Sequence, residues 1–421
     1  RLRRYSAIAG DAITIPDFFS NRFKEDKKVI MTIAAVFILI FFAVYASSCF
    51  VTVGKLFSTL FGVKYQYMMI AGAMFVLLYT IVGGFLAESA SDFMQSIVMI
   101  FALVFVSAIG FATAGGVSAV IDNVKEIPGF FEFFGIAQPS LAEGVQQLGT
   151  NGEPLFDSAG KYGFLTVLST LSWGLGYFGM PQVLIKFMAI RDAEELIKSR
   201  RVATIWCFIS LFAAIAIGLT GRVLYPSALL TKSSSESVFI LLSTNLLPPL
   251  LAGVVMAGIL AATISSSDSY LLIAASAFSK NIYQGLFKKS ASDREVMIVS
   301  RIVLISIAII GMIIALDENS VIFTVVSFAW AGFGATFGPI MLFSLFWKRT
   351  TRAGAIAGML SGGIMVFVWD RLLSPLGGVF AIYELLPAFV ISCIAIVVVS
   401  LLSKKPSEEI EKEFELARTV Q

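Results

Sequence analysis

A cluster of hydroxyl side chains and one carboxylate lies in the middle of an apolar stretch of the sequence. Residues 259–270 read Ile-Leu-Ala-Ala-Thr-Ile-Ser-Ser-Ser-Asp-Ser-Tyr, in a segment long and apolar enough to cross a bilayer. Ala262, Ser265 and Ser266 are spaced i, i+3 and i+4, so they share one face of a helix. One carbonyl and two hydroxyl groups on one face suit a small hard cation such as sodium, which prefers oxygen ligands.

The alternative for this cluster is purely structural, because hydroxyl groups in membrane helices often bond back to the carbonyl four residues earlier. The neighbouring Asp268 favours a functional site. A charged side chain at membrane depth costs about 2.5–3.5 kcal/mol on insertion scales and usually faces a bundle interior or a water-filled path.

A second group of residues predicts a break in a membrane helix. Three glycines and one proline fall within residues 174–181, where each interior glycine costs about 1 kcal/mol and proline about 3 kcal/mol. Trp173, Tyr177 and Pro181 recur every four residues, so they share a face around the break. Exposed backbone and two aromatic rings would fit a small zwitterion with an apolar body. The alternative is an interfacial aromatic belt with small residues for close packing.

Two isolated polar residues have weaker interpretations. Tyr45 lies deep in the first apolar segment, where a buried tyrosine needs a hydrogen-bond partner and is more often packing than ligand. Asp92 stands between the second and third apolar segments, where we expect a helix cap, with a gate as the alternative.

The elements that must position these residues are ten apolar segments, since about 20 residues cross the hydrocarbon. Hydrophobic residues make up 57% of the chain and charged residues 14%, against about 25% charged in soluble domains. The overlong sixth segment must be tilted, bent or extended beyond the membrane. The segments run near 30–54, 66–87, 93–115, 162–184, 202–220, 247–278, 300–316, 321–346, 353–370 and 383–402.

The distribution of basic residues supports this topology. If the ten spans alternate from a cytoplasmic Arg1, 24 of the 31 Lys and Arg residues lie inside, as the positive-inside rule predicts. We therefore expect a multi-pass protein of the inner (plasma) membrane with both ends of this chain cytoplasmic. The chain reads as one transmembrane domain, 1–421, with a first cytoplasmic segment at 1–28, spans within 29–402 and a cytoplasmic tail at 403–421, which we expect to form a solvated helix. The outward loop near 116–160 is expected to carry short helices.

Several classes of function are disfavoured. The sequence has no histidine, no phosphate-cradling glycine loop and no metal-ligand cluster, so an enzyme is not expected. Its net charge of +3 does not suggest that the protein binds nucleic acid. We expect the lipid bilayer and a small-molecule substrate as partners, and no obligate protein partner. A transporter with one ion path and one solute pocket accounts best for the two groups of residues.

These residues also carry a resemblance to a known family. The segment Trp173–Pro181, Gly83–Ala87 followed by Asp92 and Gln95, Ala262 with the two serines that follow it, and residues 329–339 resemble the sodium/solute symporter family. The likeness covers essentially the whole chain and is strongest to the proline-transporting members. It implies a thirteen-span fold built around a five-plus-five inverted repeat, of which this chain would begin after the third span and hold about ten transmembrane helices, some of them broken. On that reading this chain is all-α, holds only part of the repeat and should not transport by itself.

The resemblance also implies roles for residues. Ala262, Ser265 and Ser266 match the family's sodium site, and Tyr45, Trp173, Tyr177 and Pro181 match substrate positions of the proline-transporting members. Asp268 and Ser269 stand where some members bind a second ion or place a gate. The expected function is sodium-coupled symport of a small amino acid, L-proline first, by alternating access. Another amino acid, a pantothenate-like carboxylate, a sugar acid and a membrane solute sensor remain alternatives.

Overall fold

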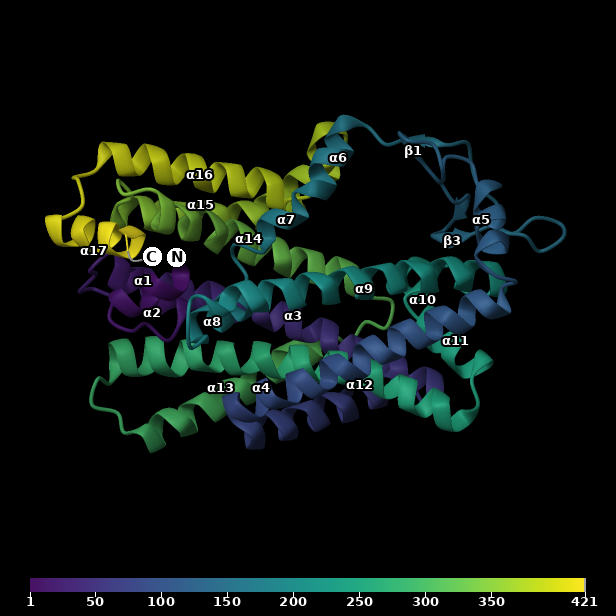
Figure 1. Cartoon of the computed structure of the whole chain (residues 1–421), viewed down its shortest axis with the longest axis horizontal. Helices are drawn as coiled ribbons and strands as arrows, with labels where there is room; N and C mark the ends of the chain where they lie inside the picture. Colours follow the sequence, from purple (N-terminus) through teal and green to yellow (C-terminus); the bar gives the residue numbers. More distant parts are fainter. Residues whose placement is uncertain (420–421) are drawn as a thin grey trace.

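Membrane-length helices dominate the molecule. The computed structural model describes residues 1–419, with the side chains of 83–89 and 419 outside the description, so the Gly83–Ala87 motif lies outside the described residues. Within the described part, nine helices are long and apolar enough to cross a membrane, and most run along the long axis of the molecule (Figure 1). These spans are Val29–Phe61 (α3), Tyr65–Val82 and Ala90–Thr113 (both in α4, Tyr65–Thr113), Glu195–Leu224 (α9), Pro249–Phe287 (α12, Pro249–Ser276, continued by the π-helix η1, Ala277–Phe287), Asp293–Ile314 (α13), Ile322–Phe346 (α14), Arg352–Leu376 (α15, Arg352–Val368, with η2, Trp369–Leu373, and η3, Ser374–Leu376) and Leu385–Leu402 (α16).

The fourth apolar segment, predicted at 162–184, is present as three short helices instead of one span. These are α6 (Phe164–Leu171), α7 (Trp173–Gly176) and α8 (Pro181–Ala189), so the chain breaks where the glycines and the proline predicted. Proline suits the first position of α8 because its missing N–H has no partner there in any case. The break lies against α14: a Cβ added at Gly179 would be 2.3 Å from the carbonyl oxygen of Phe333.

Three short helices gather at the end of the molecule where both termini lie (Figure 1). They are α1 (Leu2–Ile8), α2 (Ile15–Arg22) and α17 (Glu408–Thr419). The tail helix α17 is not simply solvated as predicted. Its Ile410, Phe414 and Ala417 are buried, because an apolar residue every three or four positions gives the charged tail one packing face. An ion pair between Lys24 and Glu413 adds to this contact.

The opposite end holds the long loop between α4 and α6 (Figure 1). It contains one helix, as expected, and four two-residue strands that the sequence analysis did not predict. Strands this short leave almost no alternation pattern to read. The elements of this loop are α5 (Val117–Lys125) and two antiparallel strand pairs, β1 (Gly135–Ile136) with β4 (Gly160–Lys161) and β2 (Leu141–Ala142) with β3 (Val145–Gln146). Outside the loop, the remaining short elements are α10 (Lys232–Ser235), α11 (Val238–Leu246) and η4 (Gly378–Ala381).

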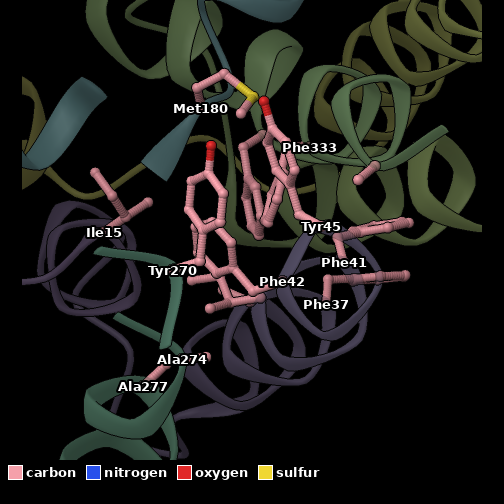
Figure 2. Packing of buried hydrophobic residues seen from close by; sticks show 14 of the residues in the cluster. Ile15, Phe37, Phe41, Phe42, Tyr45, Met180, Tyr270, Ala274, Ala277 and Phe333 are labelled. Carbon is pink, nitrogen blue, oxygen red and sulfur yellow. The ribbon is translucent and has the colours of Figure 1, made fainter. Parts of the chain in front are cut away.

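The helix α14 forms the centre of the larger hydrophobic core. In its most apolar stretch 72% of the residues are buried, the largest share among the candidate spans of the described chain. Small residues on this helix let its neighbours approach closely. Figure 2 shows the aromatic side chains packed beside it, among them Phe41 and Phe42 of α3 and Phe333 of α14. The rings of Phe42 and Phe333 have centroids 4.4 Å apart.

We predict that Gly332→Ala destabilises the protein by about 1–3 kcal/mol, the usual cost of overpacking a core. The added methyl group would lie 2.1 Å from the ring of Phe41, and that ring is fully buried. Gly253→Ala on α12 is the matched control, since a Cβ there meets nothing within 4 Å. Thermal unfolding in detergent should show a lower Tm for Gly332→Ala alone; equal Tm values would contradict the close contact.

Candidate functional site

A cavity of about 350 Å³ lies among α3, α4, α11, α12 and α14. It brings together three residues that the sequence analysis assigned to two different sites. Tyr45 of α3 lines it from one side, and Ala262 and Ser266 of α12 line it from another. None of the described residues that line it is charged. The others are Ser48, Cys49, Thr52, Met99, Ala102, Leu103, Phe239, Gly258, Ile259, Thr263, Tyr270, Ile322 and Val326.

The hydroxyl cluster of α12 divides into two groups. Thr263 and Ser267 bond back to carbonyls one turn earlier, at 2.9 and 2.6 Å, so the structural alternative holds for them. Ser265 Oγ lies 3.2 Å from the carbonyl oxygen of Ala262, to which it donates. Ser266 lies at the cavity wall. Of the three predicted sodium ligands, Ala262 and Ser266 line the cavity and Ser265 does not.

Asp268 and Ser269 are more deeply buried than Ser265 and Ser266. Their exposed fractions are 1% and 3%, and Asp268 Oδ1 accepts a hydrogen bond of 2.8 Å from the backbone N–H of Ser269. Neither residue lines the cavity that holds Ser266. Any ion at Asp268 would therefore occupy a place distinct from that cavity.

The aromatic residues at the helix break form a cluster of their own. The indole of Trp173 stacks on Phe323, Trp330 and Tyr383, with centroid distances of 5.5, 5.2 and 5.8 Å. Trp330 Nε1 donates a hydrogen bond of 3.0 Å to the carbonyl oxygen of Trp173. Tyr177 meets Trp330 edge-on at 4.8 Å and is half exposed. The exposed backbone at the break is thus satisfied in part by a side chain of α14.

The predicted substrate residues therefore do not all line one cavity. Trp173, Tyr177 and Pro181 are absent from the wall that Tyr45 shares with Ser266. Instead α14 joins the two groups, since Ile322 lines the cavity and the next residue, Phe323, stacks on Trp173. Pro181 is buried at the first position of α8.

The sequence analysis missed several residues that complete these groups. Trp330 lies within the 329–339 motif and Tyr383 at the start of the last apolar segment, and nothing in their local spacing connects them to Trp173. Tyr270 could have been found, because it stands one helical turn after Ser266 on the same face.

On α4, Asp92 forms an ion pair with Lys186 of α8. The predicted helix cap at Asp92 is wrong, because this residue lies well inside α4 and not at its first position. The pair connects α4 to the second half of the broken segment.

A second polar network joins α3 to the start of α14. Lys55 Nζ contacts Glu236 Oε2 at 3.0 Å and donates to the carbonyl oxygen of Ser320 at 2.8 Å. The carboxylate of Glu236 accepts hydrogen bonds of 3.0 Å from the backbone N–H groups of Ile322 and Phe323. A carboxylate at a helix N-terminus satisfies free N–H groups and favours the helix dipole. This network fixes the end of α14 that lies between the cavity and the aromatic cluster.

Comparison with known proteins gives consistent results. Residues 2–362 match the model of the sodium:solute symporter family. The sodium/proline symporters of Staphylococcus aureus and of its strain USA300 are 36% and 37% identical over the whole chain, which spans 78% of their length. A solved Na+-coupled sialic acid symporter, in a substrate-bound outward-open state with a novel Na+ site, superposes with a TM-score of 0.72 at 18% identity, over 97% of this chain and 84% of that one.

The fold is that of a multi-pass membrane transporter, and the predicted all-α, inverted-repeat class is confirmed. The chain belongs to the sodium:solute symporter family, and it is a sodium-coupled solute symporter rather than an enzyme. Sodium is therefore a co-transported ion and not a resident cofactor.

The start of α16 carries a carboxyl group that titrates near neutral pH. Burial, and to a lesser degree the Asp370 carboxylate, raise the pKa of Glu384 from 4.5 to about 7. Its neighbour Tyr383 stacks on Trp173, and its hydroxyl donates to the carbonyl oxygen of Ser327 at 2.7 Å. Ionisation of Glu384 therefore takes place beside the aromatic cluster.

We predict that stability falls as pH rises from about 4.5 to about 7 because of Glu384. The folded protein holds this proton more tightly than the unfolded chain, so ionisation favours unfolding across that window. Glu384→Gln should flatten the dependence of Tm on pH, whereas Glu126→Gln at an exposed position should leave it unchanged. Parallel pH profiles for Glu384→Gln and the unsubstituted protein would contradict the shift.

Proposed function

We propose that the protein carries L-proline into the cell together with sodium. The observation that carries this proposal is the cavity shared by Tyr45, Ala262 and Ser266. It offers a place for an ion and a small solute side by side. The naming of the Staphylococcus aureus relatives as sodium/proline symporters supports proline as the solute.

The chemistry of the cavity wall supports a small, neutral solute. Its described lining holds hydroxyl groups and apolar side chains and no charged residue. A zwitterion with an apolar ring has no net charge that needs a counter-ion, and its carboxylate and ammonium can be served by hydroxyls and backbone. An anion such as a sugar acid would lack a cationic partner there, and leaving a buried charge unpaired is costly.

The proposed roles follow the two groups of residues. Ala262, Ser265 and Ser266 bind the coupling sodium ion through oxygen. Tyr45 forms the solute-facing wall of the cavity. Asp268 and Ser269 hold a second ion or act as a gate.

The aromatic cluster of the broken segment is the proposed movable boundary of the solute pocket. Trp173, Tyr177 and Pro181 belong to short helices on either side of a break, which is the part of a transporter that most easily changes its angle. Closure of this segment over the Tyr45 cavity would bring the two predicted groups of substrate residues together. The half-exposed ring of Tyr177 is available for such a movement.

We further propose one transmembrane domain, in the plasma membrane, with both ends of this chain cytoplasmic. The distribution of Lys and Arg supports the orientation, and both termini lie at the same end of the molecule (Figure 1). One sodium ion moving inward through 100 mV supplies about 2.3 kcal/mol. That free energy corresponds to roughly fortyfold accumulation of the solute.

Uptake by the complete protein in proteoliposomes tests the proposal. Labelled proline should accumulate under an inward sodium gradient and not when potassium replaces sodium. Unlabelled proline should compete, while pantothenate and sialic acid should not. Accumulation of a different competitor would replace proline as the solute, and binding without any uptake would favour a solute sensor.

Replacement of a sodium ligand should weaken the binding of the ion more than the binding of the solute. We predict that Ser266→Ala raises the sodium concentration for half-maximal uptake about tenfold, the loss expected for one oxygen contact with a charge. Ser267→Ala is the matched control on the same helix, because its hydroxyl already bonds to the carbonyl of Thr263. An unchanged sodium dependence in Ser266→Ala would remove Ser266 from the ion site.

A further inference from the structure

A second cavity, of about 330 Å³, lies beside α17, at the end of the molecule that holds both termini (Figure 1). Residues 350–353 line it at the start of α15, and residues 403–407 line it directly after the end of α16. Phe23, Lys24 and Ile410 complete the lining. Because α15 and α16 belong to candidate membrane spans, the cavity lies at the level where a bilayer passes from acyl chains to headgroups.

The cavity is part of the packed structure. Four of its lining residues are at most 8% exposed, namely Phe23, Thr350, Thr351 and Ile410. Thr351 Oγ1 lies 2.7 Å from Ser403 Oγ, so a hydrogen bond connects the start of α15 to the segment after α16. The two walls of the cavity are therefore held in a fixed relation to each other.

The charged side chains that line this cavity are all basic. They are Lys24, Arg352, Lys404 and Lys405. The ammonium group of Lys24 has acidic partners, since it contacts Glu409 at 3.3 Å and also Glu413. The other three side chains are exposed and form no ion pair among the residues that the structure describes. Three like charges around one hollow attract an anion.

The acidic helix α17 does not supply that anion. Four of its five glutamates pair elsewhere, two with Lys24 and two with Lys348. The fifth, Glu408, is exposed and lines a different cavity. The basic rim at residues 352, 404 and 405 therefore stays available for a ligand from outside the chain.

An exposed apolar surface adjoins the basic rim. Leu401 and Leu402 end α16 and are 59% and 84% exposed, and Lys404 follows two positions later. In a membrane span, side chains exposed in this way face acyl chains. A molecule with an anionic head and apolar tails would satisfy both surfaces at once, whereas a free phosphate ion would use only the rim.

We propose that this cavity binds the headgroup of an anionic phospholipid. The phosphate contacts Arg352, Lys404 and Lys405, and the acyl chains lie along Leu401 and Leu402. Hydrogen bonds between basic side chains and phosphate are charge-assisted and strong, and basic pockets at the ends of membrane helices suit lipid headgroups. This inference is independent of the solute and of the sodium site.

Binding of the headgroup would join segments that are far apart in the sequence. The segment after α2, the start of α15, the end of α16 and the start of α17 all contribute to the lining. A ligand that binds the folded chain and not the unfolded chain stabilises the fold by mass action. The bound lipid should therefore raise the Tm of the protein.

The test uses the complete protein, delipidated in a neutral detergent. Phosphatidylglycerol is titrated in, and both the Tm and the one-lipid adduct in native mass spectra are recorded. Phosphatidylcholine with the same acyl chains and inorganic phosphate are titrated in parallel. The cavity variant is Lys404→Gln with Lys405→Gln. The matched control is Lys198→Gln with Arg200→Gln, which removes two exposed basic charges from α9, outside this cavity.

We expect the control and the unsubstituted protein to bind phosphatidylglycerol with the same Kd. The cavity variant should bind it about twenty-five-fold more weakly, about fivefold for each basic charge removed near the membrane surface. The rise in Tm with phosphatidylglycerol should shrink in the cavity variant alone. Phosphatidylcholine has no net charge on its headgroup and should raise the Tm less in all three proteins.

Three results would overturn the inference. They are an equal Kd in the cavity variant and the control, equal stabilisation by phosphatidylcholine, and equal stabilisation by inorganic phosphate, which would indicate a soluble anion in place of a lipid. If the cavity variant does not yield folded protein, Arg352→Gln on the opposite wall should weaken binding about fivefold. Neither readout involves transport, so failure of proline uptake is distinguishable from failure of this inference.

Discussion

The structure depends on one constraint: a polar group within the membrane needs a partner inside the protein. Water cannot supply it there, and each unsatisfied backbone group costs several kcal/mol. The helix break between Gly176 and Pro181 is possible only because it lies against α14, where Trp330 donates to the carbonyl oxygen of Trp173 and the Gly179 backbone passes close to Phe333. The small residues of α14 make that approach possible, so packing on α14 determines where irregular backbone can exist.

The same constraint separates structural hydroxyl groups from those available for function. Thr263 and Ser267 are satisfied by their own helix. Ser266 instead lines the cavity. A sequence lists these residues as one cluster, whereas their hydrogen bonds divide them.

The sequence alone predicted those features of the fold that depend on local composition. Long apolar runs gave the spans, and the glycines with Pro181 gave the break, because both depend on residues close together in the chain. The short strands at 135–161 and the buried face of α17 were missed, since two-residue strands carry almost no pattern and the charges of the tail mask its apolar residues. The cavity could not be predicted, because it requires α3, α4, α11, α12 and α14 to meet. The same is true of the stack of Trp173 on Phe323, Trp330 and Tyr383.

The uncharged wall of the cavity limits how ion and solute can influence each other. Direct contact between sodium and a solute carboxylate would couple them strongly, but only for solutes that place the carboxylate beside Ser266. Because the ring of Tyr270 on α12 stacks on the rings of Tyr45 and Phe42 on α3, the two helices are packed together beside the cavity.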